Sequence, residues 1–281
     1  MAQSMSDKIC MVTGANSGIG KVTALELARK GATVIMVCRD RGRAEPVLAE
    51  IRQATGNSRV ELMIADLSSQ QSIRQLADGF KAKYDRLHVL VNNAGAILFQ
   101  RTLTPDGLET TFAVNHLGGF LLTNLLLDTI KASAPARIIN VSSGAHVGAR
   151  IHFDDLQAEK SFSAWRAYGQ SKLANILFTV ELTRRLEGTG VTANALHPGF
   201  VRSNFAGTSR LAKAMIGLMQ PFTISPEQGA ETSIYLASSP DVEGVTGKYF
   251  VKCRPVKSTR ASTDPETARR LWQVSEQLTG L

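Results

Sequence analysis

The stretch Thr13-Gly14-Ala15-Asn16-Ser17-Gly18-Ile19-Gly20 decides the fold. It follows an apolar run, Lys8–Thr13, that predicts a strand, and it opens a helical pattern over Gly20–Lys30. Glycines here allow a tight turn and bring bare amides to a helix N-terminus, whose positive dipole end attracts phosphate. The spacing is Gly-x-x-x-Gly-x-Gly, not the commoner Gly-x-Gly-x-x-Gly. A turn that serves only helix–strand packing is the alternative, but the strand-turn-helix context favours a dinucleotide pyrophosphate.

Outward from this turn, short apolar runs alternate with longer amphipathic ones. Continuous β-branched and aliphatic composition predicts further strands buried on both faces, at Thr33–Val37, Val60–Ile64, Val89–Val91, Arg137–Val141, Val191–Leu196 and Lys248–Val251. Helices are expected at Arg43–Thr55, Ser69–Tyr84, Leu108–Lys131 and Ala164–Glu187, and helix-ending glycines at Gly31, Gly56 and Gly188. Repeated β-α-β units predict an α/β fold: a single-domain, doubly wound parallel sheet of the Rossmann type with helices on both faces.

The length of 281 residues suits one domain, residues 1–281, with a substantial core. We expect residues 1–200 to form the cofactor-binding and catalytic core, and residues 200–281 to form a lid and a C-terminal cover. The loop from Ser203 to Pro226 breaks the alternation and carries apolar residues spaced for a short amphipathic helix: Leu211, Met215, Ile216, Leu218, Met219 and Phe222. That helix would be either core cover or part of a substrate lid near residues 200–225.

Composition excludes several classes of protein. No run of about eighteen or more apolar residues is present to span a membrane. The stretch Met1–Lys8 lacks the basic-then-apolar layout of a signal peptide, so we expect no hydrophobic N-terminal anchor. The three scattered cysteines, Cys10, Cys38 and Cys253, exclude a disulfide framework and a zinc site. We therefore expect no metal and a cytoplasmic location.

The formal charge of +8 and the pI near 9.6 leave three interpretations. Nucleic acid is disfavoured as a partner, because no basic stripe is interleaved with aromatic residues, which make up only 6% of the chain. A weak contact with a membrane surface stays open, because basic residues gather near the C-terminus: Lys248, Lys252, Arg254, Lys257 and Arg260. The favoured interpretation is a solvated basic surface that attracts an anionic cofactor and substrate.

The end of the second predicted strand distinguishes NAD from NADP, because an acidic residue there would bind ribose hydroxyls whereas an arginine accommodates a 2′-phosphate. The chain has Arg39 at this position, with Arg41 and Lys21 able to approach, and Asp40 as the one discordant residue. A fork of donors suits a phosphate better than a bare sugar. A solvated loop charge is the alternative, and NADP(H) is favoured.

Tyr168 and Lys172 lie four residues apart in the predicted helix Ala164–Glu187, so both side chains emerge on one face. A tyrosine with its ordinary pKa of about 10 is a poor base at neutral pH. A nearby ammonium would stabilise the phenolate and lower that pKa toward the working range. Taken alone, a Tyr/Lys pair on a helix surface is common and indicates nothing.

Polar residues at strand ends strengthen this pair. Ser142 and Ser143 end the strand Arg137–Val141, where a hydroxyl can donate to a carbonyl oxygen that gains negative charge during hydride delivery. Small residues in Asn92-Asn93-Ala94-Gly95 leave room for a cofactor after the preceding strand. Helix caps and an Asn/Gly turn are the alternative interpretations. Asn115 lies inside an apolar helical stretch, where a buried amide needs a partner, which could be backbone or water.

Together these motifs resemble the short-chain dehydrogenase/reductase family over nearly the whole chain: Thr13–Gly20, Asn92–Gly95 and the Tyr-x-x-x-Lys of Tyr168–Lys172, with Ser143 and Asn115 in matching order. The resemblance implies that Tyr168 exchanges a proton with the substrate oxygen and that Ser143 positions that oxygen. It implies that Lys172 holds the nicotinamide ribose and tunes the tyrosine, and that Asn115 anchors a water linking Lys172 to solvent. The family often forms dimers or tetramers through its fourth and fifth helices, so a homo-oligomer is expected.

The resemblance also implies a cofactor-binding set: Gly14, Asn16, Ser17, Gly18, Ile19, Gly20, Arg39, Asp66, Leu67, Asn93, Ala94, Gly95, Tyr168, Lys172, Pro198, Gly199 and Val201. In this set Asp66 would contact the adenine ring; the alternative for Asp66 is a cap of the helix that begins near Ser69. His197-Pro198-Gly199 would lie beside the nicotinamide carboxamide, a role that does not require His197 to ionise.

The stretch between Ser143 and Tyr168 is longer than in most of the family, and its insertion Ile151–Lys160 is similar to the retinol dehydrogenase branch. So are three further segments: Ser171–Asn175, Gly247–Phe250 and Ala268–Trp272. This resemblance implies an NADP(H)-dependent enzyme that moves a hydride between nicotinamide and a lipophilic aldehyde or ketone such as retinal, or its alcohol. The alternatives are a protochlorophyllide reductase-like enzyme, a non-catalytic NADP(H)-binding redox sensor and, last, a sugar-nucleotide epimerase.

Overall fold

A computed structural model describes residues 4–200 and 224–281, which contain one eight-stranded sheet of order β3-β2-β1-β4-β5-β6-β7-β8. All neighbouring strands pair in parallel except β7 and β8, which are antiparallel. The strands are β1 Ile9–Thr13, β2 Thr33–Cys38, β3 Val60–Ile64, β4 Val89–Asn92, β5 Ala136–Val141, β6 Val191–His197, β7 Tyr249–Val251 and β8 Arg254–Val256. The predicted doubly wound parallel sheet is confirmed.

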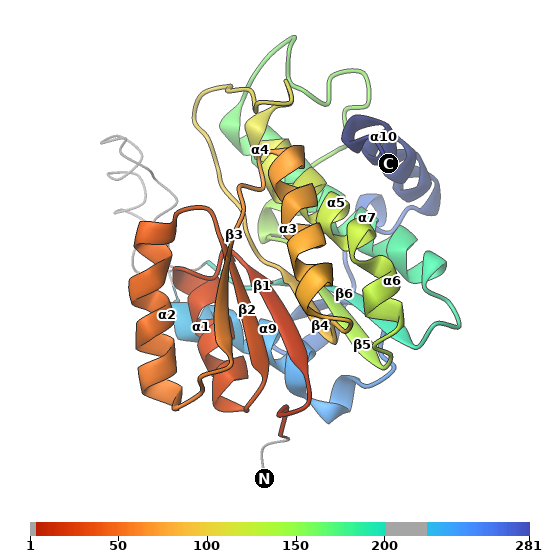
Figure 1. The fold of residues 1–281 in the computed structure, drawn as a ribbon. Coiled ribbons are helices and arrows are strands. Elements are labelled where there is room, and N and C mark those ends of the chain that lie inside the picture. Colours follow the sequence, from red (N-terminus) through yellow and green to blue (C-terminus); the bar gives the residue numbers. More distant parts are fainter. Residues whose placement is uncertain (1–3, 201–223) are drawn as a thin grey trace.

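Helices cover both faces of the sheet (Figure 1). One face carries α1 Gly18–Arg29, α2 Arg41–Thr55 and α9 Pro226–Ser238; the other carries α3 Gln70–Lys83, α5 Gly118–Leu125 and α7 Ala164–Arg185, and α10 Pro265–Thr279 packs on α7. Each face has its own apolar core, with Phe80, Phe120 and Phe178 in one and Leu27, Ile51 and Leu236 in the other. The predicted helix-ending glycines follow α1, α2 and α7, all with positive φ.

Four elements differ from the sequence prediction. The expected helix Leu108–Lys131 is broken into α4 Thr110–Phe112, a π-helical turn η1 Ala113–Leu117, α5, and α6 Leu127–Lys131. The extra residue per π turn reorients this segment at Asn115, a device frequent at functional sites. Strand β8 was not expected, and neither was α9 nor α10 as a complete helix. The β7–β8 turn places Lys252 and Cys253 at positive φ without the usual Asn or Gly signal.

The predicted lid helix and Val201 lie outside the described residues. The described residues on either side meet: the Ile224 amide donates to the Phe200 carbonyl oxygen at 2.7 Å. Within the described ranges, no helix is both long enough and apolar enough to cross a bilayer.

Candidate active site

The carboxyl ends of β1, β4, β5 and β6 form the edge where most of the predicted site residues gather. The direction of strand order reverses between β1 and β4, since β2 and β3 lie to one side and β5 and β6 to the other. In open α/β sheets, this switch point is where ligands bind.

The glycine turn after β1 has no room for a side chain at two of its three glycines, Gly14 and Gly20. A Cβ on Gly14 would lie 3.0 Å from Ala94 Cα, and a Cβ on Gly20 would lie 2.3 Å from the Gly14 oxygen. Ser17 is the N-cap residue of α1, but its side chain makes no capping hydrogen bond. The turn therefore offers a bare backbone surface and free first-turn amides to an anion, which fits a dinucleotide pyrophosphate.

Asn93 and Ala94 hold this turn in place rather than only leaving space. The Thr13 hydroxyl accepts hydrogen bonds from the amides of Asn93 and Ala94, both at 3.0 Å. In return, Asn93 Nδ2 donates to the Thr13 carbonyl oxygen at 2.7 Å. The ends of β1 and β4 are thereby locked together across the switch point.

Tyr168 and Ser143 are brought together, as predicted, by α7 and the end of β5, and their side chains share a hydrogen bond. Burial raises the pKa of Tyr168, and the hydrogen bond with Ser143 partly opposes that rise. The prediction that Lys172 pulls the pKa of Tyr168 down is wrong for this structure. The net direction is upward, because desolvation of the phenolate outweighs the opposing interaction.

Lys172 is 3% exposed and lies beside Tyr168, with Nζ 5.7 Å from the centre of the phenol ring. Its Nζ donates to the Val141 carbonyl oxygen at 3.1 Å. Burial lowers the pKa of Lys172 to about 8. The ammonium therefore loses its proton at a lower pH than a surface lysine, although it stays mostly charged at pH 7.

The buried side-chain amide of Asn115 has the hydrogen-bond partners that a buried polar group requires. Its Oδ1 accepts from the Ala96 amide at 2.7 Å, and its Nδ2 donates to the Ala96 oxygen and to Ser171 Oγ, both at 2.9 Å. A Cβ on Gly95 would lie 3.2 Å from both Asn115 Oδ1 and Lys172 Nζ. The two polar atoms therefore lie close to each other and to Gly95, which has no side chain.

Ser171 and Asn175 support this constellation, although the sequence pattern did not mark either of them as a site residue. The Ser171 hydroxyl accepts from Asn115 and donates to the Tyr168 carbonyl oxygen at 2.8 Å. Asn175 Nδ2 donates to the Val141 oxygen at 3.1 Å. Ser142 is buried and donates to the Lys172 carbonyl oxygen at 2.7 Å, so Ser143 is the serine left to face a ligand. The spacing of Ser171 and Asn175 around Lys172 on α7 was the available signal.

At the end of β2, Arg39 is exposed and makes no hydrogen bond or ion pair with the described parts of the chain. Asp40, the discordant residue, caps α2 by accepting from the Arg43 amide at 3.1 Å. Arg41 and Lys21, which were expected to approach the same phosphate, form ion pairs instead. Arg41 pairs with Glu45 of its own helix at 3.1 Å, and Lys21 pairs with Glu50 at 2.7 Å. Of the three predicted basic side chains, Arg39 is therefore the one that remains available for a phosphate.

Asp66 follows β3 and accepts from the Ser68 amide at 2.9 Å and the Ser68 hydroxyl at 2.8 Å. Capping of α3 falls to Ser69, whose side chain accepts from the Ser72 amide, so the alternative role of Asp66 as helix cap is wrong. Leu67 beside it is buried. Pro198 and Gly199 follow β6 at the same edge of the sheet.

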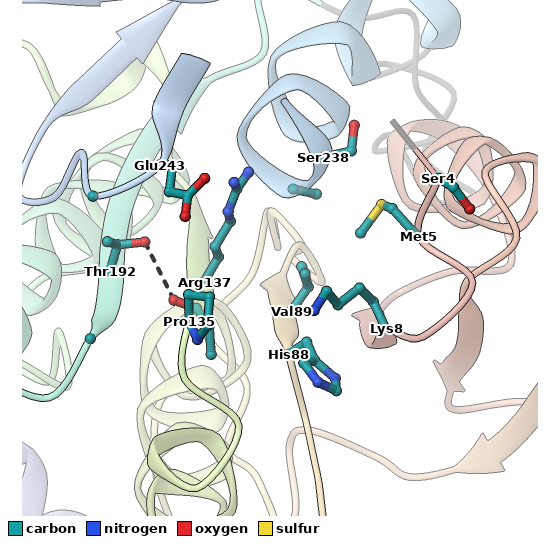
Figure 2. A pocket seen from close by; sticks show the side chains of 14 residues that line it. Ser4, Met5, Lys8, His88, Val89, Pro135, Arg137, Thr192, Ser238 and Glu243 are labelled. Atoms are coloured by element: carbon teal, nitrogen blue, oxygen red, sulfur yellow. Dashed lines mark hydrogen bonds between the residues drawn. The ribbon is translucent and has the colours of Figure 1, made fainter. Parts of the chain in front are cut away.

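A hollow of about 150 Å³ lies elsewhere, at the amino edge of the sheet, and Figure 2 shows Lys8, His88, Arg137 and Glu243 around it. None of the predicted site residues lines it. The Arg137 guanidinium donates to the carbonyl oxygens of Leu236 and Ser239 at 3.0 and 2.8 Å, and so closes the end of α9. This hollow is separate from the candidate site. No cluster of potential metal ligands occurs among the described residues.

Fold and site together define an α/β oxidoreductase with a nicotinamide dinucleotide cofactor. A family model described as short chain dehydrogenase matches residues 8–214, and the chain belongs to this family. It is 49% identical to mouse retinol dehydrogenase 12 over 98% of this chain and 87% of that protein. It is also 49% identical to human retinol dehydrogenase 11, over 98% and 86%.

The solved structures that resemble this chain support the same fold. A putative uncharacterized protein from Mycobacterium paratuberculosis has a TM-score of 0.80 and 37% identity, covering 99% of this chain and 96% of that chain. The Pseudomonas aeruginosa RhlG/NADP active-site complex has a TM-score of 0.71 and 28% identity, covering 88% and 95%. A blue fluorescent protein from a metagenomic library in complex with NADPH has a TM-score of 0.69 and 26% identity, covering 88% and 97%.

Proposed function

We propose that this chain is an NADPH-dependent reductase that converts a lipophilic aldehyde or ketone, such as retinal, to the alcohol. The proposal rests on the convergence of Tyr168, Ser143 and Lys172 at the same edge of the sheet as a turn whose Gly14 and Gly20 leave no room for a side chain. The names of the retinol dehydrogenase relatives support a retinoid-like substrate. The similar structures solved with NADP and NADPH support the phosphorylated cofactor.

When bound, a reduced nicotinamide supplies the hydride for this reaction. Tyr168 donates its phenolic proton to the substrate oxygen, which becomes the alcohol hydroxyl. Because burial raises the pKa of Tyr168, the phenol keeps its proton at neutral pH and suits donation in the reductive direction. The Ser143 hydroxyl donates a hydrogen bond to the same oxygen as negative charge develops on it.

Lys172 and Asn115 would serve cofactor binding and proton supply. The Lys172 ammonium would donate to the hydroxyls of the nicotinamide ribose. Asn115 Oδ1 and Lys172 Nζ both lie close to Gly95, and we expect one water to bridge these two atoms. Such a water would connect Lys172 to solvent and let the proton lost by Tyr168 be replaced.

The remaining cofactor contacts follow from the strand ends. Asn16, Ser17, Gly18 and Ile19 at the start of α1 would hold the pyrophosphate, and Arg39 the 2′-phosphate. The residues that follow the other strands would complete the site: Asp66 and Leu67 at the adenine, and Asn93, Ala94, Gly95, Pro198, Gly199 and Val201 toward the nicotinamide. Val201 lies outside the described residues, and its contact is carried by resemblance alone.

Exposed apolar side chains near the catalytic residues support an apolar substrate. Trp165 lies one helical turn before Tyr168 and is 57% exposed, and Val147, just after the Ser143 turn, is 65% exposed. Phe200, 62% exposed, packs edge-on against His197 at 6.1 Å. Large apolar side chains gathered at one edge mark a surface that binds apolar molecules.

For location and assembly we propose a reducing compartment such as the cytoplasm and a homo-oligomer. Cys10 and Cys38 are free and buried, as small apolar residues would be, and Cys253 is also free. Weak membrane-surface contact through the basic residues near the C-terminus remains part of this proposal. Fractionation and size-exclusion chromatography with light scattering test these points.

The central test is NADPH consumption with retinal, medium-chain aldehydes, steroid ketones, quinones and small polar carbonyls. Tyr168→Phe should abolish turnover and leave NADPH affinity nearly unchanged, because only the proton donor is lost. Tyr235→Phe, in α9, is the matched control and should keep full activity. Near-normal turnover by Tyr168→Phe would remove the proposed proton donor. A preference for small polar carbonyls would overturn the lipophilic assignment.

Cofactor choice is tested at Arg39. Arg39→Ser should raise KM for NADPH roughly tenfold or more and leave KM for NADH unchanged, because only NADPH carries the 2′-phosphate. Arg269→Ser, an exposed arginine on α10, is the control. An equal effect of Arg39→Ser on both cofactors would contradict the phosphate contact.

A further inference from the structure

The turn that carries Ser143 lies as close to the Tyr168 helix as backbone atoms allow. This turn is the short 3-10 helix η2, Gly144–His146, and Ser143 is its N-cap. A Cβ on Gly169, the residue after Tyr168, would lie 2.8 Å from the Ala145 oxygen. The separation of Ser143 from Tyr168 is therefore set by where this turn is held.

The buried imidazole ring of His146 connects this turn to the C-terminal part of the chain. His146 is 3% exposed, and its Nδ1 lies 2.7 Å from the Ser143 carbonyl oxygen. Its Nε2 lies 3.1 Å from the hydroxyl of Ser258, which in turn accepts from Ser262 Oγ at 2.6 Å. A carbonyl oxygen can only accept, so Nδ1 carries the hydrogen and Nε2 accepts from Ser258. The Tyr249 ring packs edge-on against the imidazole, with ring centres 5.1 Å apart.

A second imidazole holds the same turn from the other side. His197 Nδ1 accepts from the Gly144 amide at 3.0 Å. The carbonyl of Ser143 and the amide of Gly144 are thus fixed by two separate rings, from η2 itself and from the end of β6. Burial lowers the pKa of both His146 and His197, so both rings keep the neutral form that these hydrogen bonds require.

We propose that His146 is a positioning residue for the proposed carbonyl reduction: locked between the Ser143 carbonyl and the Ser258 hydroxyl, it fixes Ser143 Oγ against Tyr168. The inference rests on the proposed function of Tyr168 and Ser143. It adds that the segment after β8, through Ser258, sets the geometry of a catalytic site that it does not enter. The two partners are 112 positions apart in the sequence, so this contact links distant parts of the chain.

The test uses asparagine and glutamine, whose side-chain amides can each replace one nitrogen of the imidazole ring. The amide of His146→Asn places an N–H near the Nδ1 position, whereas that of His146→Gln places it near Nε2. We expect His146→Gln and His146→Ala to lose kcat about ten- to hundredfold, because a misplacement near 1 Å costs that much. His146→Asn should stay near the wild-type rate, and Ser258→Ala should fall between. NADPH affinity should be unchanged in all four.

A readout that needs no turnover accompanies the kinetics. The chain has four tyrosines, so Tyr168 can be followed by ¹³C NMR after assignment with Tyr168→Phe. Because the Ser143 hydrogen bond lowers the pKa of Tyr168, His146→Ala should raise that pKa and His146→Asn should leave it unchanged. If His146→Ala does not fold, Ser258→Ala gives the same comparison. His152→Ala, an exposed histidine in the nearby insertion, is the control.

The outcomes separate the two proposals. Full kcat and an unchanged pKa of Tyr168 in His146→Ala or Ser258→Ala, alongside an active wild type, would overturn the positioning role alone. Equal losses in His146→Asn and His146→Gln would also overturn it, because the Nδ1 donor would then not matter. An inactive wild type across the carbonyl panel would count against the proposed function. The Tyr168 titration would still decide whether His146 holds Ser143.

Discussion

Replacing Lys172 with methionine should stabilise the fold at neutral pH while abolishing catalysis. Lys172 is 3% exposed, and burial lowers its pKa from 10.5 to about 8. At about 1.4 kcal/mol for each pKa unit, keeping the ammonium charged in the folded state costs about 3 kcal/mol. Methionine has a similar volume and no charge. The Val141 oxygen keeps a donor, because Asn175 Nδ2 also reaches it at 3.1 Å.

The gain should depend on pH in a defined direction. The folded pKa of Lys172 lies below its unfolded value, so the cost is present in full below about pH 8. It decreases between about pH 8 and 10.5 and vanishes above 10.5, where both states are neutral. At about pH 9.5 we therefore expect less than half of the gain seen at pH 7.

The assay is urea denaturation of the wild type and Lys172→Met at these two pH values, without cofactor. Lys160→Met, an exposed lysine, is the control and should change the free energy of unfolding by less than about 0.5 kcal/mol. A variant less stable than the wild type at pH 7 would refute the reasoning. So would an equal gain at both pH values, because the cost would then not come from the buried charge.

Two further predictions concern the glycine turn and the catalytic serine. Gly20→Ala should lose NADPH binding, measured by fluorescence titration, because its Cβ would meet the Gly14 oxygen at 2.3 Å. Gly79→Ala, in α3 with open space around it, should instead gain roughly 1 kcal/mol, and intact binding in Gly20→Ala would contradict the close-approach argument. Ser143→Ala should shift the alkaline rise of alcohol oxidation to higher pH, because its hydrogen bond lowers the pKa of Tyr168. A rate profile against pH with an unmoved midpoint would argue against that contact.

Much of the fold could be predicted because buried parallel strands leave continuous apolar runs. The features that could not be predicted depend on backbone geometry rather than on the pattern of apolar residues. The β7–β8 hairpin turns at Lys252 and Cys253, which carry no turn signal. The π turn around Asn115 keeps the apolar composition of an ordinary helix, so periodicity alone could not reveal the break.

Part of the candidate site could be predicted from the sequence for a related reason. Strand ends and helical spacing brought out Ser143, Tyr168 and Lys172, because parallel strands end at a common edge. The sign of the pKa change at Tyr168 was not readable, since it depends on how deeply the phenol is buried. The contact of His146 with Ser258 joins positions far apart in the chain, and no local pattern marks it.

The hydrogen bond between Phe200 and Ile224 has a consequence for how new specificities arise. Phe200 ends one described range and Ile224 begins the next, and the 2.7 Å hydrogen bond holds these two ends side by side. Because the two ends already lie together, exchanging residues 201–223 for the counterpart of a relative should change the ligand preference while β6 and α9 stay folded.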